Sequence, residues 1–157
     1  MNIRLLVISK TDVPYIQQGI EEYVRRLGHY VRFEIDVIPA LKGLHGLSAE
    51  EVKEREAPLL LAKMKNADRV VLLDEHGAER GSVDFAQYLQ RQMNAGVRTL
   101  MFVVGGAYGF APSVHKAAHD KMSLSKMTFN HQMVRLIFVE QLYRAFTILA
   151  HEPYHNE

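Results

Sequence analysis

Histidines and arginines that could act as bases or bind anions gather toward the end of this 157-residue sequence. Five of its eight histidines follow residue 110. His131 and Arg135 are four residues apart, as are Glu140 and Arg144, and side chains at this spacing share one face of a helix. An imidazole titrates near neutral pH and can remove a proton, whereas a guanidinium can hold a phosphate or a developing negative charge. Glu140 and Arg144 could equally form a simple ion pair within the helix.

The segment 153–155, Pro-Tyr-His, offers a second chemical possibility. Tyr154 could stack on a nucleic-acid base and His155 could hydrogen-bond to it. Short terminal segments are also commonly disordered, and the pattern by itself favours disorder.

Gly105, Gly106 and Gly109 form a third feature, because they follow directly on an apolar run at 99–104. Glycine has no Cβ, so a ligand can approach the backbone closely. The pattern Gly-Gly-x-x-Gly differs from the dinucleotide fingerprint, no acidic residue follows about 20 positions later, and no phosphate-loop Gly-Lys-Ser/Thr is present. These glycines therefore indicate either tight strand-to-helix turns or a cofactor loop of another kind.

Metal chemistry is not indicated. The chain has no cysteine, which excludes thiolate ligands and disulfides and fits a reducing cytoplasm. His115 and His119 have a spacing that can bind zinc, but the Glu-x-x-His context of a zinc site is missing. We expect no metal.

The elements that must position these residues alternate along the chain. Apolar runs predict strands, and 3.6-residue periodicity with capping signals predicts helices. Strands are expected at 4–8, 31–38, 70–73, 99–104 and 121–124, and helices at 14–27, from the Ser48 cap through Met64, and at 83–94, 112–119 and 131–150. This alternation predicts a single α/β domain over residues 1–157 with a mainly parallel sheet. Ligands bind beyond the carboxyl ends of such strands, here the loops 74–77, 105–110 and 123–129.

Three helices carry more detailed predictions. Ser48 and Glu51 form a capping box, Pro58 should kink or restart its helix, and Ser82 should cap the helix at 83–94. The helix at 131–150 is apolar on every side and must be buried on every side. The simplest cover is a second subunit related by a two-fold axis, and the alternative is a central core helix within one chain.

Composition narrows the class of protein. Net charge is +1, too low for a protein that coats nucleic acid by charge alone. The run Leu5–Ile8 is too short for a signal-peptide core, and no apolar run is long enough for a membrane span. We expect a protein without membrane contact that recognises any nucleic acid by local geometry.

Four motifs in order resemble those of one known family: VVGGAYG at 103–109, LSKMTFNHQMVR at 124–135, EQLYRA at 140–145 and PYH at 153–155. They are similar to the SPOUT class of methyltransferases, in particular the family that methylates N3 of a pseudouridine in large-subunit ribosomal RNA. The resemblance covers essentially the whole chain. It implies a trefoil-knotted α/β fold and a homodimer with the last helix in the interface. It also implies that S-adenosylmethionine (SAM) is bound by Leu73, Gly105, Leu124, Ser125, Lys126, Met127, Thr128 and Phe129.

The implied reaction needs a base, because N3 of pseudouridine must lose a proton before it attacks the methyl group. We expect His155 or His131 in this role. Arg135 and Arg144 could stabilise charge on the base carbonyls or hold phosphates of the ribosomal RNA, and Tyr154 could stack on a flipped base. The tail and the cofactor loops could come from different subunits.

Two alternatives remain open at this point. One is a non-catalytic ribosome-assembly or RNA-binding factor on the same scaffold, which would bind RNA without binding SAM. The other is a flavodoxin-like nucleotide binder with an open, unknotted sheet. Neither accounts for the segment 124–135.

Overall fold

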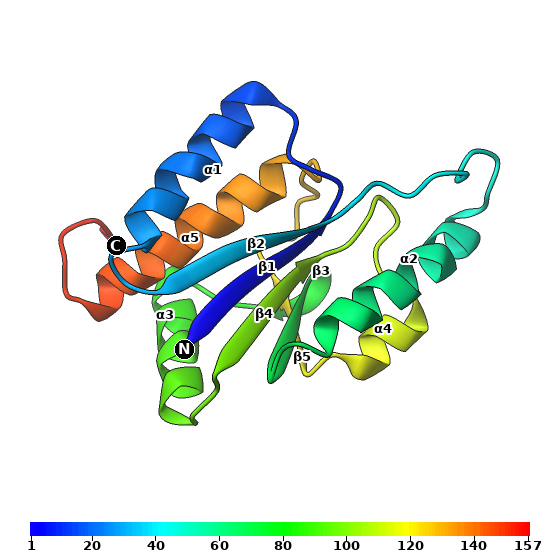
Figure 1. Ribbon diagram of the computed structural model, residues 1–157. Helices are drawn as coiled ribbons and strands as arrows, with labels where there is room; N and C mark the ends of the chain where they lie inside the picture. Colours follow the sequence, from blue (N-terminus) through cyan, green and yellow to red (C-terminus); the bar gives the residue numbers. More distant parts are fainter.

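A computed structural model describes all 157 residues, and its centre is a five-stranded sheet in which every pair of neighbours is parallel (Figure 1). The strand order is β2-β1-β4-β3-β5. The strands are β1 (Asn2–Ile8), β2 (Arg32–Ile38), β3 (Arg69–Glu79), β4 (Thr99–Val104) and β5 (Asp120–Ser123). The predicted parallel α/β sheet is confirmed.

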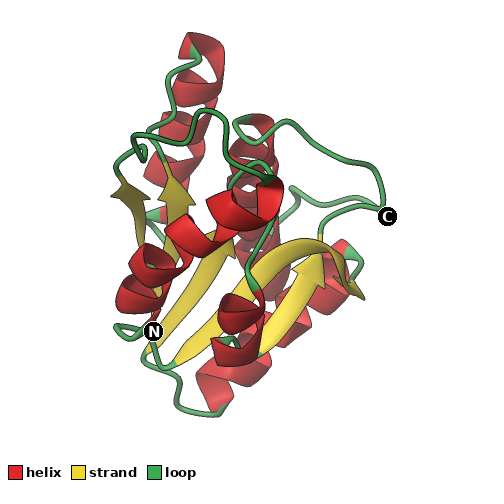
Figure 2. Ribbon diagram, turned by 90° about the vertical axis from the view of Figure 1, so that its right-hand side faces the viewer, coloured by secondary structure: helices red, strands yellow, loops and turns green.

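Helices cover both faces of the sheet (Figures 1 and 2). The longest helix, α5, packs between α1 and α3 on one face, and α2 and α4 lie together on the other. The helices are α1 (Pro14–Leu27), α2 (Ala49–Met64), α3 (Ser82–Asn94), α4 (Pro112–Ala117) and α5 (Met133–Leu149). None of them is long and apolar enough to cross a membrane.

The apolar runs form strands because both of their faces are covered. Residues 100–104 of β4, in the middle of the sheet, are all buried. On the α5 side Phe102 packs against Phe138, with ring centroids 4.7 Å apart, and both side chains are fully buried. On the α2 side Met101 and Val103 pack with Leu60 and Val114. The core thus fixes the sheet between two helical layers, and its carboxyl edge carries the loops of interest.

The capping box is confirmed. Ser48 Oγ accepts the N–H of Glu51 at 3.2 Å, and Glu51 Oε1 accepts the N–H of Ser48 at 3.3 Å. The predicted Ser82 cap was wrong, and of the two effects predicted for Pro58 the restart does not occur. Helix α2 runs through Pro58 without restarting, and α3 begins at Ser82 after Gly81. The Ser82 hydroxyl donates to Gln141 Oε1 of α5 at 2.8 Å, so a tertiary bond replaces the expected cap.

Strand β3 is longer than its apolar run, and the predicted loop at 74–77 lies inside it. Leu73 pairs with Met122, and Ala78 then pairs with the same Met122, so the residues between them form a wide bulge. A Cβ on Gly77 would lie 2.6 Å from backbone atoms of Lys121 and Met122, so only glycine fits this close approach. Bulges re-aim side chains beside functional sites, and this one directs 74–76 toward the carboxyl edge.

The alternative of a central core helix required α5 to be enclosed on all sides by its own chain, and it is not. A stripe formed by Met133, Leu136, Ile137, Glu140 and Arg144 is only half-buried. The trefoil knot and the second subunit that would cover this stripe remain predictions.

Candidate functional site

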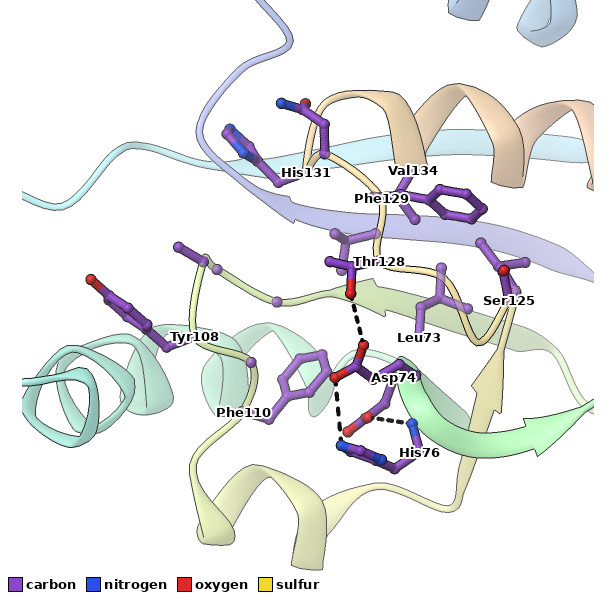
Figure 3. A pocket seen from close by; sticks show the side chains of 18 of the residues that line it. Leu73, Asp74, His76, Tyr108, Phe110, Ser125, Thr128, Phe129, His131 and Val134 are labelled. Carbon is purple, nitrogen blue, oxygen red and sulfur yellow. Dashed lines mark hydrogen bonds and ion pairs between the residues drawn. The ribbon is translucent and has the colours of Figure 1, made fainter.

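A cavity of about 620 Å³ opens beside the bulge of β3 and the carboxyl ends of β4 and β5 (Figure 3). The bulge residues 74–76 of β3 and the loops 105–110 and 124–131 supply most of its lining, and all three follow apolar runs whose ends were predicted to carry the site. The cofactor residues suggested by the resemblance meet there: Leu73, Gly105, Leu124, Ser125, Met127, Thr128 and Phe129. Lys126 does not line the cavity, because its exposed side chain points to Glu79 Oε1 at 3.7 Å.

The segment after β5 is held by its own hydroxyl groups. Ser123 Oγ donates to the carbonyl of Ser125 at 2.9 Å, and Ser125 Oγ accepts the N–H of Met127 at 2.9 Å. Thr128 Oγ1 donates to Glu75 Oε2 at 3.2 Å, which joins this segment to the bulge of β3 (Figure 3). Two walls of the cavity are therefore tied together.

The glycine-rich loop forms a third wall. The Gly109 N–H donates to the Gly106 carbonyl at 3.2 Å, and Gly109 has a φ of 86°, which favours glycine. A Cβ on Gly106 would collide with the carboxyl group of Glu56 from α2. Glu56 is 4% exposed, its Oε1 has no hydrogen-bond partner, and burial raises its pKa. The absence of side chains at 105 and 106 thus lets the loop pack closely while keeping the cavity open.

Asp74 and His115 were missed as site residues by the sequence analysis. Asp74 Oδ1 accepts the N–H of His76 at 2.9 Å, and Asp74 Oδ2 lies 3.7 Å from His115 Nε2. The His115 ring packs edge-on against Phe110, and its Nδ1 is buried without a partner. The only available signal was the position of Asp74, directly after a buried strand.

The structure separates His115 from His119. Helix α4 ends at Ala117, so the two rings do not share a helix face, and His119 Nδ1 accepts the N–H of Val70 at 3.0 Å. No group of three or more histidine or acidic side chains is placed to hold a metal ion.

His131 lines the cavity, but Arg135 does not. Arg135 is 2% exposed and donates to the carbonyls of Ile8, Ser9 and His131 and to Thr11 Oγ1, at 2.8 to 3.1 Å. Burial lowers its pKa. In this geometry Arg135 is not placed for the direct contact with RNA that its sequence position suggests, because its donors are used within the protein. It instead fixes the carboxyl end of β1 to the start of α5.

Gln132 acts beside Arg135 and was also missed. Its Oε1 accepts the N–H of Asp12 at 3.0 Å, and its Nε2 donates to the Lys10 carbonyl at 3.2 Å. Gln132 is 5% exposed, so the loop between β1 and α1 is bound to the start of α5 by buried polar contacts. These contacts set where the cavity-lining segment ends and the helix begins.

The tail is ordered rather than disordered, and it packs against the far end of α5. Arg144 Nη2 and Nε donate to Glu140 Oε1 at 2.6 and 3.1 Å, and Tyr154 OH donates to the same oxygen at 3.0 Å. Tyr23 OH lies 3.2 Å from Tyr154 OH, and Arg144 Nη1 lies 3.2 Å from His155 Nδ1. Burial, together with hydrogen bonds to Tyr23 and Glu140, raises the pKa of Tyr154 well above its ordinary value.

The candidate residues therefore form two groups within one chain. Val134 of α5 lines the cavity, and Arg144 follows ten residues later, about 15 Å along the helix axis. Arg144, Tyr154 and His155 form the second group, which we call the tail cluster together with Glu140 and Tyr23. His131 belongs to the cavity and His155 to the tail cluster.

Comparison with known proteins gives a consistent result. Residues 1–155 match the family model described as "Predicted SPOUT methyltransferase". Proteins named ribosomal RNA large subunit methyltransferase H match over the full length of both chains: 50% identity in Flavobacterium johnsoniae, 52% in Porphyromonas gingivalis and 53% in Parabacteroides distasonis.

Solved structures share the fold at low sequence identity. A provisional RNA methyltransferase of Bacillus anthracis superposes with a TM-score of 0.54 at 13% identity, covering 99% of each chain. A probable methylase family protein of Haemophilus influenzae gives a TM-score of 0.56 at 9% identity, covering 96% of this chain and 66% of the other.

Proposed function

This chain belongs to the SPOUT family of methyltransferases, and from that we propose that it transfers a methyl group from SAM to large-subunit ribosomal RNA. The substrate is carried over from full-length relatives whose names state it. We further propose N3 of a pseudouridine as the acceptor atom and the cytoplasm, where ribosomes are, as the location. The observation that carries the proposal is the convergence of the three predicted loops on one cavity.

The cavity fits an adenosine-containing ligand. Its volume of about 620 Å³ is in the range of small-molecule sites, and Leu73, Val104 and Leu124 give it an apolar part. A Cβ on Gly105 would lie 3.1 to 3.2 Å from Phe110 and the Gly109 carbonyl, so glycine at this position lets the loop pack tightly in the cavity wall. Leu73, Gly105 and the segment 124–129 would hold the cofactor, with Lys126 at its outer edge.

SAM, when bound, supplies a methyl group on a positively charged sulfur, which leaves as the acceptor nitrogen attacks in line. The protein has to align the acceptor and to take the N3 proton. His131 is exposed, lines the cavity and forms no hydrogen bond through its ring, so one of its ring nitrogens is free to accept a proton. We therefore favour His131 over His155 as the base.

His155 is better suited to donate than to accept. A guanidinium can only donate, so His155 Nδ1 must be the acceptor for Arg144 and Nε2 carries the proton in the neutral ring. Neither nitrogen then has a free lone pair. His155 Nε2–H and the Arg144 guanidinium are donors suited to a carbonyl oxygen of the target base, and the Tyr154 ring can stack on it.

The tail cluster and the cavity can act on one nucleotide only if they come from different copies of the chain. We propose a two-fold dimer in which the half-buried stripe of α5 packs against itself in antiparallel fashion. This arrangement would bring the tail cluster of one protomer toward the cavity of its partner, because the two groups lie at opposite ends of the same helix. It would also cover Met133, Leu136 and Ile137.

Two experiments test these proposals. Ribosomal nucleosides from cells lacking the protein should lack one methylated pseudouridine in mass spectrometry, and purified protein with SAM should restore it. An unchanged nucleoside profile would refute the substrate and favour a non-catalytic RNA-binding role.

Mixing variants tests the shared site. H131A and Y154A should each be inactive alone. After subunit exchange, about a quarter of wild-type activity should return, because half of the dimers are mixed and each holds one intact site. If no activity returns while mixed dimers are present, the two groups do not combine across the interface.

A further inference from the structure

One carboxylate that lines the cavity, that of Asp74, is not among the predicted cofactor-binding residues. Asp74 directly follows the expected cofactor residue Leu73, and its side chain is 15% exposed, the least exposed acid of the cavity lining. It lies at the start of the β3 bulge and points into the cavity near His76 and Phe110 (Figure 3). Such a carboxylate is costly to desolvate unless a positive charge or donors satisfy it.

Within the protein, only one of the two oxygens of this carboxylate accepts a hydrogen bond. The His76 N–H fixes Oδ1 at 2.9 Å and so holds the side-chain orientation. Oδ2 has no hydrogen-bond donor, because His115 Nε2 at 3.7 Å is beyond hydrogen-bond distance. Asp74 Oδ2 is therefore oriented and still able to accept.

The charge of the whole lining points the same way. With histidines neutral, the charged lining residues are Lys53, Asp74 and Glu75, which sum to −1. Lys53 is paired with Glu50 at 2.9 Å and so does not neutralise the two acids, of which Asp74 is the less exposed. A cavity of this kind favours a cationic ligand.

We propose that Asp74 binds a positive charge of SAM and thereby contributes to the affinity of the cavity for the cofactor. This inference rests on the proposed function. The cofactor carries two positive charges, the sulfonium and the α-ammonium, and methyl transfer removes the first by turning the sulfonium into a neutral thioether. If Asp74 faces the sulfonium, its attraction ends with the reaction, which favours product release.

Calorimetry with the purified protein separates the possibilities. The variant D74N keeps the shape and an oxygen for the His76 N–H but removes the charge. We expect its dissociation constant for SAM to rise about five- to twentyfold, and the salt dependence of binding to weaken, with melting temperature near that of wild type. D84N is the matched control, because Asp84 lies on α3, pairs with Arg80 outside the cavity and carries the same charge.

Binding of the demethylated product and of sinefungin, an analogue with an ammonium group in place of the sulfonium methyl, identifies which positive charge Asp74 contacts. Weaker binding of SAM and sinefungin alone assigns Asp74 to the sulfonium, and weaker binding of all three assigns it to the α-ammonium. Affinity for SAM within twofold of wild type would overturn the inference. Wild-type protein that binds none of the three would instead overturn the proposed function.

Discussion

Replacing Arg135 should damage the fold rather than the chemistry, although its position just after the cavity loops suggests catalysis. In R135M the apolar stem stays, but the carbonyls of Ile8 and Ser9 and the Thr11 hydroxyl lose their donor at a buried position. A hydrogen bond to a charged group contributes about 1.5–3 kcal/mol. Three such losses are partly offset, because the variant no longer has a guanidinium to desolvate. The net destabilisation is about 3–5 kcal/mol.

A change of this size lowers the melting temperature of a chain of this length by about 6–20 °C. Scanning calorimetry and urea unfolding measure it directly. R135K should be intermediate, since an ammonium cannot serve all three acceptors in the guanidinium's fork geometry. The matched control is R32M, because Arg32 is 71% exposed and its pairing with Glu34 is a surface ion pair. A melting temperature of R135M within about 2 °C of wild type, together with lost methylation, would refute the structural role and restore a direct contact with RNA.

Three further predictions follow from individual contacts. E56Q should have the same free energy of unfolding as wild type at about pH 4, and at about pH 8 its free energy of unfolding should be higher by on the order of 1–2 kcal/mol. Urea unfolding at a series of pH values measures both. The sign follows because burial raises the folded pKa of Glu56, so wild type loses stability as pH rises from the unfolded pKa through the folded one, whereas glutamine does not ionise. G106A should destabilise the protein by about 1–3 kcal/mol by pressing a Cβ onto that carboxyl group, and a smaller effect in the E56A background would confirm the contact. E140Q should lower methylation about tenfold with SAM affinity within twofold, because Glu140 Oε1 positions Arg144 and Tyr154 in the tail cluster, which lies outside the cavity of the same chain. Hydrogen exchange of residues 151–157 should rise, and unchanged exchange would contradict the positioning role.

Local patterns predicted the parts of the fold that local forces determine. The strand at 99–104 and the helix at 14–27 were placed with the observed bounds, because an apolar run and a proline start are visible in the sequence itself. The 74–79 extension of β3 was missed, since residues of that type form a strand here only because Met122 of β5 supplies a partner. Ser82 was read as a cap for the same reason: its partner Gln141 lies 59 residues away.

The same limit applies to the site. Strand ends and glycines located the cavity, because parallel strands place all their carboxyl ends at one edge. The role of Arg135 could not be predicted from its spacing with His131, since the decisive contacts are to β1, more than 120 residues earlier in the chain. Asp74 was missed because a single acidic residue after a strand is typical of many turns, and only its burial distinguishes it.

Helix α5 links these observations, because its two ends are fixed by different parts of the chain. Arg135 and Gln132 hold its start against β1 and the following loop, whereas Glu140 and Arg144 hold the tail near its end. A rigid helix keeps the cavity and the tail cluster about 15 Å apart, so no movement of the tail residues alone joins them in one protomer. Glu140 and Arg144 also lie on the half-buried stripe with Leu136, where a dimer interface would bury them. The pairing at 2.6 Å and the hydrogen bond from Tyr154 to Glu140 offset part of the cost of burying these charges, and for that reason we expect the stripe to be an interface despite its polar end.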